Sequence, residues 1–498
     1  MTQNTWIERA AQCKPVIHNW IAGRSKPTGG DQQITKYSAR DGHLLYAFGE
    51  GHSVDVETAV VAARAAFVDG RWSRLPMAQR KAVLLKLADL MASRAEELAL
   101  LECLDVGKPI THALQEDVAG SLHILRSAAE GAEQLLSKAS VDGPGPNMVY
   151  QVRKPIGVVG AIVGWNYPLV LSVMKMAPAL MMGNSLVLKP SEFTALSAAR
   201  VAELATEAGV PDSVFNVING AGAVVGDALA RHPDVNLLAF TGSSATGKKL
   251  MVSAGQSNMK RLLLECGGKS PYLVFDDCAD LDFVALHATR TAFRNQGQLC
   301  AAATRLVVQE SVMDRLIPKL IDQAKKLVPQ DPLDPATTFG ALMNEPHLRK
   351  VLNYIDSGKQ DGAELVHAGR RVEPIKGGYY LEPNIFLNVK KSMRIAQEEI
   401  FGPVLSIMPF RTEEEAVSIA NDSAYGLAAS VGTTNLGRAH RLARNLDAGQ
   451  LVIVGTSTPS AGGTSLGVEP QKESGFGTEG GLDGLAAYAA VNTVRVLV

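Results

Sequence analysis

The chain has 498 residues, of which 46% are hydrophobic and 20% are charged, so it holds enough apolar material for about three domains. Its formal net charge of −1 gives no electrostatic reason to expect nucleic acid or an anionic membrane as a partner. The five cysteines lack paired spacing, and we find neither a signal peptide nor an apolar run of membrane-spanning length. We therefore expect a soluble, cytoplasmic protein with reduced thiols.

The first part of the chain predicts two helices behind a turn-rich segment. Residues 1–50 are rich in turn-forming residues and predict short strands and loops. Apolar residues then recur at helical spacing. They are Val56, Val60, Ala63 and Phe67 in the first helix and Leu84, Leu87, Met91, Ala95 and Leu98 in the second. Gly107 and Pro109 help to end the second helix, and neither stripe is assigned any chemistry.

Short apolar strands alternate with helices from residue 156 onward, which is typical of a parallel, doubly wound sheet. Strands are expected at 156–163, 185–189, 213–218, 237–240, 261–265 and 271–275. The alternation then resumes with a helix at about 282–295, a strand at 305–309 and a helix at about 312–327. A second α/β domain is therefore expected, and Gly267 with Gly268 marks the crossing into it.

Two further segments have strand character but no obvious partner within a domain. These are MVYQVRKPIG (148–157) and the C-terminal AAYAAVNTVRVLV (486–498). Unpaired strands at the margin of a domain are hazardous unless another chain covers them. We therefore expect both segments to form oligomer contacts.

A cysteine and a glutamate are the first candidates for chemistry. Cys300 follows the turn-prone Asn295-Gln296-Gly297-Gln298 run, and small residues come after it. A lone cysteine is usually a small buried hydrophobe. Here, however, the amide of Asn295 and the backbone N–H of Cys300 could converge on one developing oxyanion. Glu265 ends an apolar run just before a glycine pair, and a thiol together with a carboxylate suggests covalent acyl chemistry.

Polar residues also stand at the carboxyl ends of predicted strands, where open α/β sheets bind nucleotides. Lys189 and Glu192 follow one strand, and Glu192 would suit ribose hydroxyls, although an ordinary polar helix entry looks the same. Gly242 and Ser243 lie between a strand and a helix, where backbone N–H groups can approach a phosphate. Such a turn is most often only a turn. Asn166 stands at another strand end, in GWNYP.

Taken together, these stretches resemble the aldehyde dehydrogenase superfamily from about residue 15 to the C-terminus. The matching pieces are GWNYP, KPSE, FTGS, ECGGKSP, NQGQLC, EEIFGPV, NDSAYGLAA and KESGFGTEGG. Any one of them is weak, whereas eight in order are very specific. The resemblance implies NAD(P)-dependent oxidation of an aldehyde to a carboxylic acid.

The resemblance also implies an α/β fold with a Rossmann-like NAD-binding domain, an α/β catalytic domain and a β-strand oligomerisation arm. We expect the NAD-binding domain at 5–132 and 156–267 and the catalytic domain at 268–467. The arm is expected at 133–155 and 480–498. A homo-oligomer is implied, a tetramer rather than a dimer.

By motif, Cys300 resembles the nucleophile that attacks the aldehyde to give a thiohemiacetal. Asn166 resembles the side-chain oxyanion donor and replaces Asn295 in that role, with the Cys300 backbone N–H as its companion. Loss of hydride to the nicotinamide leaves a thioester. Glu265 resembles the general base that activates the hydrolytic water. The resemblance implies no metal.

The implied cofactor contacts are Trp165, Lys189, Glu192, Gly222, Gly226, Phe240, Thr241, Gly242, Ser243, Gly267, Glu399 and Phe401. Lys189 and Glu192 resemble contacts to the adenosine ribose. Glu399 and Phe401 resemble the grip on the nicotinamide ribose, and Ser243 lies at the pyrophosphate turn. We expect NAD rather than NADP, because the Glu192 carboxylate would repel a 2′-phosphate. Lys189 weakens that repulsion, so we expect NAD to be preferred without NADP being excluded.

The chain departs from the family pattern at four places. Cys266 follows the general base where the family often has Leu, and His347 aligns where many members have a Gln that contacts the nicotinamide ribose. Gly455 stands where Asn is usual, and the stretch 467–472 differs from P-F-G-G-x-K. The substrate mouth is therefore where this chain is expected to differ.

The implied substrate pocket is mostly apolar. Its residues are Tyr167, Leu171, Met174, Leu299 and Ala301. No arginine stands among them to pair with a substrate carboxylate, so we expect an uncharged, bulky aldehyde, aromatic or medium-chain. A broad-specificity enzyme is the plain alternative.

Three other functions were weighed. A CoA-acylating semialdehyde dehydrogenase would transfer the thioester to CoA, but such relatives generally lack the base at Glu265. A binding protein that had lost its activity would lack Cys300, Glu265 or Asn166, and all three are present. Thioester hydrolysis without redox would need no cofactor turn, yet Lys189 and Glu192 are in place.

Overall fold

The larger of two main sheets is built around five parallel strands. A computed structural model describes residues 2–141, 148–456 and 466–497. The eight strands of this sheet are, in order, β2 (Arg24–Lys26), β1 (Asn19–Ile21), β9 (Phe215–Val217), β8 (Ser185–Lys189), β7 (Val158–Ile162), β10 (Leu237–Thr241), β11 (Arg261–Glu265) and β23 (Gly475–Phe476). From β9 to β11 the strands run parallel. Their chain order of 3-2-1-4-5 is that of a doubly wound sheet.

Two layers of helices cover this sheet because successive strand residues point to opposite faces. Val159 and Leu186 join the core beneath α3 (Met77–Ser93), α4 (Ala95–Val106), α6 (Ala119–Gly131), α7 (Pro168–Met181) and α8 (Leu196–Ala208). Val158 and Val187 face α2 (Ser53–Asp69), α9 (Asp227–Arg231) and α10 (Ser244–Gly255). The strands are therefore buried on both faces, which explains their continuous apolar runs.

The second sheet has seven strands, and all but β14 run parallel. Its order is β14 (Glu364–His367), β17 (Asn384–Leu387), β18 (Val404–Phe410), β13 (Arg305–Gln309), β12 (Pro271–Val274), β20 (Ala428–Gly432) and β21 (Gln450–Val454). One face packs on α11 (Leu281–Phe293) and α12 (Glu310–Ala324). The other packs on α13 (Glu345–Gln360), α14 (Arg394–Gln397), α15 (Glu413–Asn421) and α16 (Leu436–Asn445).

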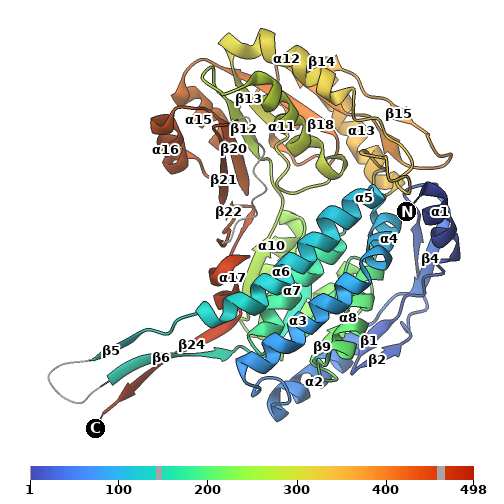
Figure 1. The fold of residues 1–498 in the computed structure, drawn as a ribbon, viewed down its shortest axis with the longest axis vertical. Coiled ribbons are helices and arrows are strands. Elements are labelled where there is room, and N and C mark those ends of the chain that lie inside the picture. Colours follow the sequence, from blue (N-terminus) through green and yellow to red (C-terminus); the bar gives the residue numbers. More distant parts are fainter. Residues whose placement is uncertain (1, 142–147, 457–465, 498) are drawn as a thin grey trace.

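An arm projects from the body that contains the first sheet (Figure 1). It is a sheet of β5 (Ala139–Val141), β6 (Met148–Pro155) and β24 (Ala489–Val496), in the order β24-β6-β5. The expectation that both strand-forming segments lack a partner in their own chain is wrong, because β24 pairs along the whole of β6. The outer edge of β24 is still free within the described part of the chain.

The remaining elements are short and join these parts. They are α1 (Gln3–Gln12), β3 (Gln33–Tyr37), β4 (Leu44–Gly49), α5 (Ile110–His112), the π-helical turn η1 (Ala113–Val118), the turn η2 (Ala132–Gln134), the π-helical turn η3 (Gly222–Gly226), the turn η4 (Arg294–Gly297), β15 (Arg371–Val372), β16 (Tyr380–Leu381), β19 (Tyr425–Gly426), β22 (Gln471–Lys472) and α17 (Gly481–Ala487). In the described ranges, no helix has the length and apolarity that a membrane crossing requires.

Two helix predictions need correction. Residues 3–12 form α1 where strands or loops were expected; Thr2 caps it through a hydrogen bond from Thr5, and Trp6 is buried. The stripe from Leu84 to Leu98 belongs to two helices, because the backbone leaves helical geometry at Arg94 (φ −110°, ψ 20°). Periodicity survives such a break, so the pattern alone did not show it.

Candidate active site

The candidate site lies where edges of the two main sheets meet. Asn166 follows the carboxyl end of β7, and its Nδ2 donates to the carbonyl of Gln298, which precedes β13, at 3.0 Å. Gly268 follows β11, and its N–H donates to Oε1 of Glu399, which precedes β18, at 3.0 Å. The carboxyl edge of the first sheet thus faces the amino edge of the second.

The loop before Cys300 has an unusual backbone. Asn295 (φ 48°), Gln296 (φ 57°) and Gly297 (φ 74°) all lie in the left-handed region. Only glycine fits at 297, because a Cβ there would lie 2.3 Å from the carbonyl oxygen of Gly402. Gln298 fixes the loop by accepting from the Met343 N–H at 3.0 Å. Such strain persists only where the surroundings hold it, and it is common at functional sites.

The Cys300 thiol is half-buried and protonated at neutral pH. Burial raises its pKa to about 12, and the carboxylates of Glu399 and Glu265 act in the same direction. The backbone N–H groups of Ala301 and Cys300 oppose this rise. Because the thiolate is the nucleophile, reaction at this site requires an acceptor for the thiol proton.

The structure distinguishes the two asparagines, Asn295 and Asn166, that the sequence offered as side-chain donors to an oxyanion. The Asn295 amide donates to the Asn166 carbonyl at 3.0 Å and to the Gln298 carbonyl at 3.2 Å. Both of its hydrogens are therefore used to hold the backbone. Asn166 spends one amide hydrogen on Gln298, which leaves the second for another acceptor.

Glu265, the last residue of β11, lies in a buried charged group that the motif search missed. Burial raises the pKa of its carboxyl to about 8, Glu479 adds to the rise and Lys175 opposes it. Lys175, on α7, contacts Glu479 in an ion pair. The Oε1 of Glu265 is buried without a partner among the described residues. A lysine inside the apolar α7 was the available signal, since buried lysines are almost always paired.

Lys189 and Glu192 form an ion pair at the carboxyl end of β8, with 2.8 Å between Nζ and Oε2. Burial lowers the pKa of Lys189 against the pull of Glu192. Burial would raise the pKa of Glu192, but Lys189 and the backbone N–H groups of Glu192 and Gly222 together hold it below the usual value. Gly222, the first residue of η3, donates to Glu192 at 3.4 Å, and Gly226 ends the same turn.

The turn after β10 places four of the predicted cofactor contacts. Phe240 is buried in the core, and Thr241 has a buried hydroxyl without a partner among the described residues. The Gly242 N–H donates to the Glu265 carbonyl at 3.0 Å. Ser243 caps α10 by accepting from the Thr246 N–H at 3.2 Å. Phe240 therefore packs in the core beneath the turn, whereas Thr241, Gly242 and Ser243 form the turn itself.

An aromatic cluster surrounds Phe401. Trp165 meets the rings of Phe401 and His347 edge-on, at 5.2 Å in each case. Phe401 has φ 63°, and His347 Nε2 lies 2.7 Å from its carbonyl oxygen. Burial lowers the pKa of His347 to about 4, so the ring is neutral and donates from Nε2. Gly267 lets the Glu399 carboxylate lie close to the backbone, since a Cβ at position 267 would lie 2.5 Å from Glu399 Oε2.

Comparison with known proteins identifies the family. The sequence model described as the aldehyde dehydrogenase family matches residues 26–494. The chain belongs to the aldehyde dehydrogenase family. The resemblance and the fold class predicted from the sequence are thereby confirmed.

Curated relatives and solved structures cover nearly all of this aldehyde dehydrogenase. The NADP/NAD-dependent aldehyde dehydrogenase PuuC of Escherichia coli (strain K12) is 44% identical over 452 residues, which cover 91% of this chain and 90% of the relative. The aminoacetaldehyde dehydrogenase of Pseudomonas aeruginosa is 41% identical over 459 residues, or 92% and 91%. The structure of KauB from Pseudomonas aeruginosa has 44% identity and a TM-score of 0.96, covering 100% and 99% of the two chains. A mutant of P. syringae AldA, an indole-3-acetaldehyde dehydrogenase solved with NAD+ and IAA, has 43% identity and a TM-score of 0.97 over 100% of both chains.

The predicted substrate residues of this aldehyde dehydrogenase come from two elements. Tyr167 immediately precedes α7, which carries Leu171 and Met174, and Leu299 and Ala301 flank the thiol. Leu171 is buried and the other four are half-buried. The Tyr167 hydroxyl is buried without a partner among the described residues, and the ammonium of Lys108 lies 3.9 Å from the centre of its ring.

The five predicted pocket residues include no arginine, but one arginine outside the group lies close to Tyr167. Arg294, six positions before the thiol, donates from Nε to Glu116 Oε2 at 2.8 Å. The charges of both residues bear on the Tyr167 hydroxyl, as does Cys300. Glu116 lies 178 positions away in the chain, so no local pattern could have revealed the pair.

Proposed function

We propose that this enzyme oxidises an aldehyde to its carboxylic acid with NAD as the cofactor, through a covalent intermediate on Cys300. The observation that carries the proposal is that the thiol of Cys300 and the carboxyl of Glu265 share one site, where the Glu265 carboxylate helps to raise the pKa of the thiol. Nucleophile and base are then available in one place. The NADP/NAD-dependent and NAD+-bound relatives support the choice of cofactor.

The residues at the carboxyl edge fit a dinucleotide. Glu192 accepts a short bond from Lys189 and a long one from Gly222, so its oxygens keep lone pairs for ribose hydroxyls. The Thr241 hydroxyl, which has no partner in the described part of the chain, and the α10 N-terminus behind Ser243 offer donors for phosphate. Trp165, Glu399 and Phe401 would hold the nicotinamide end. When bound, NAD supplies the acceptor for the hydride that leaves the substrate carbon.

The chain's own groups account for the remaining chemistry. The Cys300 thiol gives up its proton to solvent and its sulfur forms a bond to the aldehyde carbon. The second amide hydrogen of Asn166 and the Cys300 N–H stabilise the carbonyl oxygen, which becomes negative. After hydride loss, the thioester is attacked by water. Glu265 takes the proton from that water, and a pKa of about 8 suits a base that works near neutral pH.

For the substrate, we propose a bulky aldehyde, aromatic or medium-chain, whose carbon chain next to the reacting group is apolar. Leu171, Met174, Leu299 and Ala301 support this, because their side chains offer only apolar contacts. The absence of an arginine among the predicted pocket residues supports an uncharged substrate, as expected from the sequence.

We also propose a cytoplasmic homotetramer, rather than a dimer, assembled through the arm. The five cysteines lie within the described ranges and are all free. The outer edge of β24 presents backbone groups that another chain can pair with. The proposed domains remain 5–132 with 156–267, 268–467, and 133–155 with 480–498. Light scattering at micromolar concentration tests the assembly, and an active monomer would contradict it.

The proposed reaction is tested with benzaldehyde and NAD, in the presence and absence of CoA. We expect equal amounts of NADH and benzoate without CoA, and an acyl adduct at Cys300 by mass spectrometry of rapidly quenched samples. Turnover that requires CoA and yields benzoyl-CoA would contradict the hydrolytic mechanism and favour the acylating alternative.

A further inference from the structure

The peptide that joins Asn166 to Tyr167 is held by a buried ammonium that none of the proposed chemical steps uses. Nζ of Lys108 donates to the carbonyl oxygen of Asn166 at 3.1 Å. The same nitrogen lies 2.6 Å from Oδ1 of Asp117 and 3.9 Å from the centre of the Tyr167 ring. The three N–H groups of the ammonium are therefore matched by a carboxylate, a carbonyl and the face of an aromatic ring.

The backbone on both sides of Lys108 fixes where its side chain starts. Gly107 caps the end of α4 in the left-handed region, at φ 85°, and a Cβ there would lie 2.6 Å from the Cβ of Ala39. The Gly107 carbonyl accepts from the Ala341 N–H at 2.9 Å, and the ring of Pro109 fixes the next φ. The Lys108 side chain is 2% exposed. The ammonium is therefore presented at a defined place inside the protein.

Asn166 is held through its backbone and through its side chain. Its carbonyl accepts from the Asn295 amide at 3.0 Å as well as from Lys108. Its own amide donates one hydrogen to the Gln298 carbonyl at 3.0 Å, and the other hydrogen is the proposed oxyanion donor. An oxyanion is stabilised only by donors already aimed at it. The direction of the second hydrogen depends on how the Asn166 backbone is held.

The start of α7 has an anchor of its own, so Lys108 is not needed to hold the helix. The buried Glu102 accepts from the N–H of Leu169, the second residue of α7, at 3.2 Å. The Lys108 bond falls instead on the residue that carries the oxyanion donor. Neutralising Asp117 would not require that bond either, because the ammonium and the carboxylate already balance each other.

Resting on the proposed function, we infer that Lys108 is a positioning residue for the oxyanion donor. Its bond to the Asn166 carbonyl keeps that residue where its second amide hydrogen points at the substrate oxygen. Asp117 orients the ammonium and balances its charge. Lys108 thus acts through Asn166 and not by contact with the substrate. Because a misplacement of about 1 Å can cost about a hundredfold in rate, the loss of this bond should be visible in kcat.

A double-mutant cycle with benzaldehyde and NAD tests whether Lys108 acts through Asn166. Lys108→Met should lower kcat by about tenfold or more, while NAD binding, followed by tryptophan fluorescence, stays within about twofold. Asn166→Ala should lower kcat by about a hundredfold or more. In the Asn166→Ala background, Lys108→Met should then change kcat by less than about twofold. An equal loss of kcat in both backgrounds would show that Lys108 acts by another route, and the inference would be wrong.

A second comparison separates positioning from folding. Lys108→Met leaves the Asp117 charge buried without its cation and should lower the Tm. Lys108→Met/Asp117→Asn removes that charge, so the Tm should recover while kcat stays low. Recovery of both would mean that Lys108 only neutralises Asp117, which overturns the inference. Should Lys108→Met not fold, the double variant decides by its kcat.

Lys260→Met is the matched control. It removes another buried ammonium that donates to a backbone carbonyl, that of Ala230, next to the amino end of β11. Its kcat should stay within about twofold of the unmodified enzyme, and a loss as large as that of Lys108→Met would contradict the inference. An unmodified enzyme that oxidises no aldehyde would remove the proposed function and this inference with it, whereas the other outcomes overturn the inference alone.

Discussion

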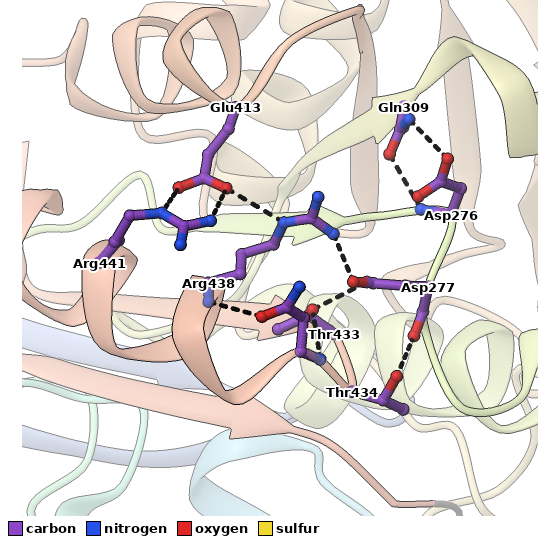
Figure 2. A network of polar contacts seen from close by, with 9 residues as sticks. Asp276, Asp277, Gln309, Glu413, Thr433, Thr434, Arg438 and Arg441 are labelled. Carbon is purple, nitrogen blue, oxygen red and sulfur yellow. Dashed lines mark hydrogen bonds and ion pairs between the residues drawn. The ribbon is translucent and has the colours of Figure 1, made fainter.

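The two parallel sheets use their carboxyl edges differently. In the first sheet this edge carries Asn166, Lys189, Ser243 and Glu265, and Asn166 and Gly268 bond across to the amino edge of the second. In the second sheet the carboxyl edge carries a closed polar network (Figure 2). Asp277, after β12, accepts from Arg438 at 2.6 Å and from Thr433 at 2.8 Å.

The rest of that network is equally complete. Glu413 pairs with Arg438 at 3.1 Å and with Arg441 at 2.7 Å, and Gln309 and Asp276 exchange two bonds at 2.9 Å. Within it, Arg438 and Arg441 balance the charges of Asp277 and Glu413. At the first edge, by contrast, Thr241 Oγ1 and Glu265 Oε1 are buried without partners in the described chain. A saturated edge stabilises its own domain, whereas an unsaturated one is ready for a ligand.

The largest effect is expected at the thiol. Cys300→Ser should lower turnover by at least about a thousandfold, because an alcohol has no comparable anion fraction at neutral pH. NAD binding, followed by the quenching of tryptophan fluorescence, should be retained. Cys278→Ser, on the second domain away from the candidate motifs, is the matched control. Normal turnover of Cys300→Ser would contradict the assignment of Cys300 as the nucleophile.

Glu265→Gln should spare the first hydride transfer more than hydrolysis. We expect a burst of NADH close to one equivalent per site, followed by a steady state lowered by about a hundredfold or more. Stopped-flow absorbance separates the two phases. If both fall equally, Glu265 acts before the thioester forms, as the acceptor of the thiol proton.

The pH profile should report the charges around Glu265. The base must be ionised, and its pKa of about 8 means that kcat rises with pH up to that value and falls about tenfold per unit below it. Glu479→Gln removes a carboxylate that raises this pKa, so the rising part of the kcat profile should move to lower pH. Lys175→Met removes the opposing cation and should move it to higher pH. Shifts in the same direction for both variants would contradict the described electrostatics.

The cofactor preference should depend on Glu192. We expect NAD to be preferred, and Glu192→Ser to narrow the ratio of kcat/KM for NAD over NADP by about tenfold, because the carboxylate no longer repels a 2′-phosphate. Glu413→Ser, at the closed edge, is the control and should leave the ratio as it was. Equal use of both cofactors by the unmodified enzyme would count against the assignment of Glu192.

The smallest effect on catalysis is expected at the closed edge. Asp277→Asn should lower the free energy of unfolding by about 1–3 kcal/mol, because Arg438 loses a charged partner. The kcat/KM should stay within about twofold of the starting value. Urea unfolding and steady-state kinetics check the two expectations. A large loss of activity without loss of stability would mean that this edge also serves catalysis.

The local pattern of the sequence determined the strands and the family. The predicted strands at 185–189, 261–265 and 305–309 coincide with β8, β11 and β13. Each is an apolar run, and β8 and β13 are buried on both faces, so the local pattern needs no information from elsewhere in the chain. The motifs that carry Cys300 and Glu265 are likewise contiguous, so short-range reading was sufficient to name them.

Only the tertiary structure decided which distant groups meet. The pairing of β24 with β6, of Lys175 with Glu479 and of Arg294 with Glu116 joins segments 178 or more positions apart. The pKa of Glu265 and the charges near Tyr167 follow from the last two of these contacts. Periodicity describes which face of an element is buried, but a charged contact depends on where two such faces come together in space, and that is set by the packing of the whole chain.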